Sequence, residues 1–131
     1  MEGINQKQHS FEDIKAWQLA RNFRKNIYKI TKIFPREELY CLTAQMRRAV
    51  ISITSNIAEG YGRYNFQENI QFCRTARGSL IEILDQLYVA LDESYINQEK
   101  FDNLYNEGKN VERAINGYIG FLKEQQLKYR K

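Results

Sequence analysis

Apolar residues recur every three or four positions along most of the chain, which is the spacing of one face of an α-helix. The pattern predicts four helices, at about residues 11–34, 36–60, 65–92 and 98–126. The links between them are short, and one proline and seven glycines are few for a protein built of strands and turns. We therefore expect an all-α fold, an antiparallel up-down-up-down four-helix bundle that forms a single domain over residues 1–131.

Residue types that are favoured at the ends of helices stand at the expected helix ends. Ser10, Asn65 and Asn97 are each expected to cap the helix that follows. Pro35 should end the first helix, because the residue before a proline is pushed out of the helical region, and should then serve as the first residue of the second. Segment 60–62, Gly-Tyr-Gly, is expected to end the second helix in a left-handed C-cap.

A polar stripe runs along the second helix beside its apolar face. It consists of Gln45, Arg48, Ser52, Asn56 and Glu59. Such groups are costly to bury unless each finds a partner. The stripe is therefore expected to have a structural role and to meet either the other helices of the fold or a second chain.

The third helix has a charge within its apolar seam. Arg77 lies between Cys73 and Leu80, where a charged group is expensive unless it is paired or lies at the edge of the core. Glu59 and Glu82 are its candidate partners. The small residues 76, 78 and 79 beside it are expected to let another helix approach closely, within the monomer or between subunits.

The net charge of +4 is unevenly distributed. Residues 14–77 hold twelve basic and four acidic residues, and no acid stands between Asp13 and Glu37. The outer face of the first helix is strongly basic, which suits either a polyanion surface or a plain solvated face. The candidate nucleic-acid-binding residues are Lys15, Arg21, Arg24, Lys25, Lys29, Lys32, Arg36 and Arg63.

The residues suited to catalysis are few. His9 is the sole histidine, and the two cysteines, Cys41 and Cys73, fall on apolar stripes and are expected to be reduced packing residues. We expect no catalytic residues, no metal site and no cofactor, because neither the Glu-x-x-His pairs of di-iron bundles nor a zinc cluster is present. The polar N-terminus and the lack of an apolar run of roughly 18 residues favour a cytoplasmic protein without a membrane span.

Several motifs together resemble one family. They are Phe34-Pro35 followed by Glu38, Leu42-Thr43-x-Gln45-x-Arg47-Arg48-Ala49, Ser52-Ile53-x-x-Asn56-Ile57-Ala58-Glu59-Gly60 and Gly78-Ser79-Leu80-x-Glu82. With Phe11-Glu12-Asp13-x-x-x-Trp17, they resemble the 23S rRNA intervening-sequence protein family over roughly residues 10–122. Cys41 departs from the glycine that the family often has there, whereas both neighbours match.

The resemblance implies a bacterial four-helix bundle that assembles as a homo-oligomer, a pentamer in several members, with no known enzymatic activity. A distant relative, the accessory variability determinant of diversity-generating retroelements, is a basic pentamer that binds nucleic acid. Two functions therefore remain open: an oligomer that binds RNA or DNA through the basic face, or a protein-interaction scaffold that assembles through the second helix and binds an acidic protein. An enzyme using Arg48, Glu59 and Glu82 is a third, weaker hypothesis.

Overall fold

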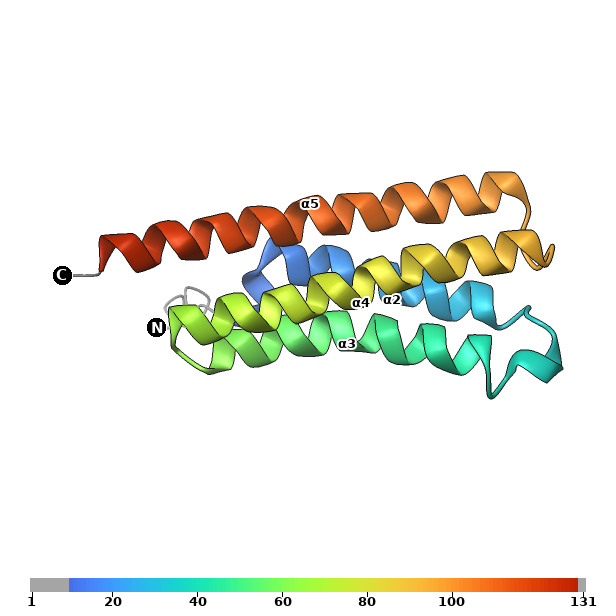
Figure 1. Cartoon of the computed structure of the whole chain (residues 1–131), viewed down its shortest axis with the longest axis horizontal. Coiled ribbons are helices and arrows are strands. Elements are labelled where there is room, and N and C mark those ends of the chain that lie inside the picture. The colour runs from blue at the N-terminus through green and yellow to red at the C-terminus, as the bar shows by residue number, and fades with distance from the viewer. Residues whose placement is uncertain (1–9, 130–131) are drawn as a thin grey trace, which may run out of the picture.

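The structure is a computed structural model that describes residues 10–129, and its regular elements are all helices. Four long helices are preceded or linked by two short 3-10 turns. In chain order the elements are η1 (Phe11–Asp13), α2 (Lys15–Thr31), η2 (Arg36–Glu38), α3 (Leu42–Gly62), α4 (Phe66–Asp92) and α5 (Gln98–Lys128). Consecutive long helices reverse direction and are connected at alternating ends of the molecule (Figure 1). The all-α four-helix bundle is confirmed.

The apolar stripes of all four helices meet in one hydrophobic core. Each helix contributes residues at the three-and-four spacing that predicted it, because this spacing keeps one face turned to the bundle axis. The largest side chains without solvent exposure include Phe23, Ile27, Met46, Ile53, Leu80, Leu87 and Ile115.

The first predicted helix is shorter at both ends. Ile14 has an extended backbone (φ −75°, ψ 122°) that separates η1 from α2, and α2 ends at Thr31. The Ser10 backbone N–H donates to the Asp13 carboxylate over 3.3 Å, so Ser10 caps the 3-10 turn and not the long helix. Phe11 packs edge-on against Trp17, with ring centroids 5.2 Å apart, which holds the turn against α2.

The second predicted helix begins six residues later than expected. Pro35 opens the 3-10 turn η2, and Cys41 adopts a non-helical backbone (φ −121°, ψ −102°) before α3 starts at Leu42. Glu38 lies outside the helix: one carboxylate oxygen accepts the Leu42 N–H over 3.2 Å, and the other accepts the Tyr95 hydroxyl over 2.7 Å. Glu38 thus caps α3 and ties it to the α4–α5 connection.

The expected glycine C-cap at the end of the second helix is wrong. Helix α3 continues through Gly62, and no described glycine has a positive φ; the left-handed residue is Tyr64, at φ 55°. Gly60 is buried against α4, where an added Cβ would lie 2.7 Å from Asn69 Oδ1 and 2.9 Å from Phe72 Cβ. Gly60 is therefore needed for the close approach of α3 and α4.

The other predicted caps are confirmed. The Asn65 side chain accepts the Glu68 N–H over 2.9 Å, and the Asn97 side chain accepts the Lys100 N–H over 2.8 Å. Among residues 10–129, none of the helices combines the length and the apolar character that crossing a bilayer requires.

Candidate nucleic-acid interface

Helix α2 presents a basic outer face to solvent. Its apolar side, which includes Ala20, Phe23 and Ile27, is fully buried in the core. The opposite side is basic because the charged residues follow the same helical period. Five of the predicted binding residues are exposed there: Lys15, Arg21, Lys25, Lys29 and Lys32. We call these five residues the α2 basic face.

The remaining predicted binding residues differ in their surroundings. Arg24 is half-buried and donates from Nη1 to Thr54 Oγ1 over 2.8 Å, so it links α2 to α3. Arg63 pairs with Glu59 at 3.1 Å, and its guanidinium lies over the Phe72 ring, 5.1 Å from the centroid. Arg36 is exposed on η2. Arg24 and Arg63 are thus engaged within the chain, whereas Arg36 can reach a ligand.

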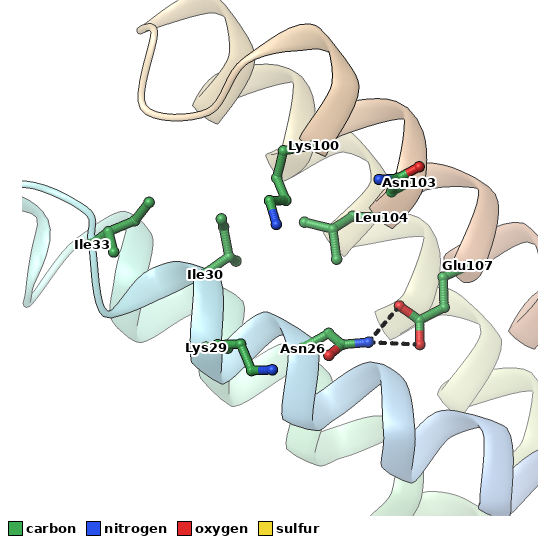
Figure 2. A pocket seen from close by; sticks show the side chains of 8 residues that line it. All are labelled: Asn26, Lys29, Ile30, Ile33, Lys100, Asn103, Leu104 and Glu107. Carbon is green, nitrogen blue, oxygen red and sulfur yellow. Dashed lines mark hydrogen bonds between the residues drawn. The ribbon is translucent and has the colours of Figure 1, made fainter.

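A hollow of about 370 Å³ lies between α2 and α5 (Figure 2). Lys29 and Lys100 line this hollow from the two helices, and Lys100 points from α5 toward α2; Ile30 and Leu104 supply apolar surface. Asn26 Nδ2 donates to both carboxylate oxygens of Glu107, over 2.9 and 3.1 Å, and so closes one end. The hollow therefore carries one negative and two positive side chains.

A second hollow, of about 290 Å³, lies on the other side of α2, where the chain passes into α3. Its basic lining residues are Lys32, Arg36 and Arg47. Arg47 is not among the binding residues predicted from the sequence. Its position beside α2 could have been inferred, because residues 43, 47, 50 and 54 follow helical spacing on the side of α3 that meets α2.

The sequence matches the family described as 23S rRNA-intervening sequence protein over residues 12–117, most of the 131-residue chain. The chain belongs to the 23S rRNA-intervening sequence protein family. The fold is also that of a crystal structure of a protein of unknown function from the S23 ribosomal protein family of Bacteroides thetaiotaomicron VPI-5482. The TM-score is 0.74 at 19% sequence identity, and the match covers 80% of this chain and 95% of the other. No curated protein matches the chain.

In this intervening-sequence protein the polar stripe of α3 divides into two parts. Ser52 and Asn56 are half-buried at the seam with α4. Asn56 Nδ2 donates to the Ser52 carbonyl and hydroxyl oxygens over 2.8 and 2.9 Å, and the Ser52 hydroxyl lies 2.9 Å from that of Ser79. Gln45 and Arg48 are exposed, as is Glu59. The middle of the stripe thus connects α3 to α4, and its outer members face solvent.

The partners proposed for Arg77 are wrong. Arg77 Nη1 donates to Asn116 Oδ1 on α5 over 2.7 Å, whereas Glu59 pairs with Arg63 and Glu82 accepts a hydrogen bond from Gln86. Arg77 is only half-buried, so it lies at the margin of the core and needs no buried carboxylate.

The two cysteines are free thiols in different surroundings. Cys73 is fully buried, and burial raises the pKa of its thiol to about 12. Cys41 was expected on an apolar stripe, but it is exposed because it falls in the turn before α3. Among residues 10–129, no group of three His, Cys, Asp or Glu side chains is placed to hold a metal ion, and His9 lies outside the described residues.

Proposed function

We propose that this intervening-sequence protein is a non-enzymatic RNA- or DNA-binding bundle that works as a homo-oligomer in the cytoplasm. The observation that carries the proposal is the α2 basic face: four exposed cations on α2 and a fifth, Lys32, directly after it, with no acid in the chain between Asp13 and Glu37. Nucleic-acid backbones present rows of phosphates to such a surface, so the binding would depend on charge and only weakly on sequence.

Assembly would multiply the effect of each face. The pentameric state of similar family members is the basis for proposing an oligomer here. Each additional subunit that engages the same strand raises the local concentration of the next, so modest contacts per subunit give a high overall affinity. Size-exclusion chromatography with light scattering measures the subunit number, and a monomer at all concentrations would refute the oligomeric part.

The binding part is tested with a labelled stem–loop RNA, a labelled duplex DNA and fluorescence anisotropy at a series of KCl concentrations. The variant carries Arg21→Gln, Lys25→Gln and Lys29→Gln. A matched control carries Arg74→Gln, Lys123→Gln and Lys128→Gln, which remove three exposed charges from α4 and α5.

We expect the α2 variant to bind more weakly and with a smaller salt dependence. The slope of the logarithm of the binding constant against the logarithm of the salt concentration should fall in magnitude by about 0.9 for each lost phosphate contact with duplex DNA, and by about 0.7 for each with a single strand. The control should stay near the wild type. Equal losses in the two variants, or wild-type affinity that does not fall as salt rises, would refute the proposed interface. Absence of RNA and DNA binding, together with capture of an acidic protein that survives nuclease treatment, would instead support the scaffold function.

A further inference from the structure

Three basic side chains converge where α2 ends and α3 begins. Lys32, Arg36 and Arg47 line the hollow of about 290 Å³ described above, and the residues that line it include no acid. At roughly 30 Å³ per water molecule, the hollow has room for a phosphate group and several waters. Its position beside the α2 basic face makes it accessible to a strand that lies along that face.

Arg47 is held in a fixed orientation. Its Nε donates to Thr31 Oγ1 over 2.9 Å, its Nη2 donates to the Tyr28 carbonyl over 3.4 Å, and the guanidinium lies over the Tyr28 ring at 4.7 Å. These bonds use two of the five N–H groups, so the others stay available. A guanidinium fixed in advance loses little entropy when it binds a phosphate through two parallel hydrogen bonds.

A hydroxyl without a hydrogen-bond partner among the described residues lies beside these cations. Thr43 lines the hollow and is only 4% exposed. Its hydroxyl takes part in none of the hydrogen bonds found among residues 10–129. Among residues 10–129 the buried side-chain oxygen without a partner is Gln86 Oε1, so the Thr43 oxygen is open to solvent within the hollow. An oxygen atom of a bound anion would accept a hydrogen bond from this hydroxyl.

No acid of the described part of the chain lines the hollow. Glu38 lies outside it, with its carboxylate oxygens bonded to the Leu42 N–H and the Tyr95 hydroxyl. Glu37 is exposed on η2 and does not line the hollow. The carbonyl end of α2 carries a partial negative charge, and the contact of Arg47 with the Tyr28 carbonyl offsets part of it. The hollow between α2 and α5 differs, because Glu107 lies within it.

We propose that this hollow binds one phosphate group, with Lys32, Arg36 and Arg47 as charge partners and the Thr43 hydroxyl as an additional donor. The inference rests on the proposed function for its occupant: the group is a phosphodiester of bound RNA or DNA, and the hollow anchors the strand that the α2 basic face attracts. Free inorganic phosphate has the same chemistry, and the two experimental arms below separate the two sources.

The first arm measures the site without nucleic acid. Inorganic phosphate is added to the full chain, and the Arg47 Nε–Hε resonance is followed by NMR, with chloride at equal ionic strength as the reference. We expect a saturable shift with phosphate alone. Thr43→Val keeps the shape of the side chain and removes its hydroxyl, so it should bind phosphate more weakly, about tenfold for a hydrogen bond to a charged group. Its melting temperature should stay near that of the wild type, because the Thr43 hydroxyl bonds no other group within residues 10–129.

The second arm measures RNA affinity. The variant Lys32→Gln/Arg36→Gln removes two charges at the hollow, of which Lys32 also belongs to the α2 basic face. The matched variant Arg21→Gln/Lys25→Gln removes two charges of that face that do not line the hollow. We expect the first to weaken stem–loop RNA binding about tenfold more than the second, because its two charges act at one enclosed phosphate. Neither variant alters Arg47. Because Arg21 lies over the Trp17 ring, 5.7 Å from its centroid, the melting temperatures of both variants are compared with the wild type first.

The outcomes separate this inference from the proposed function. A phosphate-dependent shift of Arg47 together with the larger loss for Lys32→Gln/Arg36→Gln supports it. A shift without RNA or DNA binding by the wild type refutes the proposed function and leaves the hollow as a site for free phosphate. Wild-type RNA binding with equal losses in the two variants overturns the phosphodiester as occupant. An Arg47 resonance that phosphate leaves unchanged overturns the site itself.

Discussion

The close approach of α3 and α4 at Gly60 predicts that Gly60→Ala destabilises the fold, although alanine is the better helix former. A Cβ at this position would lie 2.7 Å from Asn69 Oδ1, 2.9 Å from Phe72 Cβ and 3.1 Å from the Asn69 backbone oxygen. The backbone oxygen and the Phe72 Cβ cannot rotate away. The two helices would therefore have to separate locally.

The expected size follows from two opposing terms. Replacing a glycine inside a helix by alanine stabilises the fold by about 1 kcal/mol. Inserting a methyl group into a packed contact costs about 1–3 kcal/mol. If Asn69 moves, its 3.3 Å hydrogen bond to the Tyr118 hydroxyl is lost as well, which adds about 1 kcal/mol. With the Asn69 bond lost, we expect a net loss of about 1–3 kcal/mol for Gly60→Ala.

Urea denaturation followed by circular dichroism measures this loss as a lower midpoint at unchanged slope. Gly120→Ala is the matched control, because Gly120 is an exposed residue of α5 with no atom within 4 Å of the added Cβ. This control should gain up to about 1 kcal/mol. A Gly60→Ala protein at least as stable as Gly120→Ala would refute the packing argument.

Three further predictions concern single side chains. Because burial raises the pKa of Cys73 to about 12, a thiol reagent at pH 8 should modify only Cys41 in the folded protein; rapid modification of both would contradict this. The hydrogen bond to Glu38 raises the pKa of Tyr95 from 10.0 to about 12. This hydrogen bond therefore stabilises the fold fully below pH 10, and its contribution is lost as the pH rises toward 12. The melting temperature of the wild type should exceed that of Tyr95→Phe below pH 10, and the difference should vanish toward pH 12. A difference that persists above pH 12 would contradict this role of the bond. Asn56→Ala removes two hydrogen bonds of a half-buried side chain and should cost about 1 kcal/mol in urea denaturation; an unchanged curve would be inconsistent with the bonds.

The number and type of the helices, two of their caps and the basic character of α2 could be predicted from the sequence. Each of these depends on residues three or four positions apart, as the hydrogen bond from the Glu68 N–H to the Asn65 side chain illustrates. The helical period also separates the buried side of α2 from its charged side, so the exposure of Lys25 and Lys29 follows without knowledge of the other helices.

Only the tertiary structure decided which side chains meet across helices. Glu38 links the first N–H of α3 to Tyr95, 57 positions away, and Arg77 binds Asn116 on α5 in place of a carboxylate. The hollow that brings Arg47 to Lys32 arises in the same way. Such pairs depend on how far each helix is rotated and shifted against its neighbour, and that is set by the packing of the whole core, which no local pattern encodes.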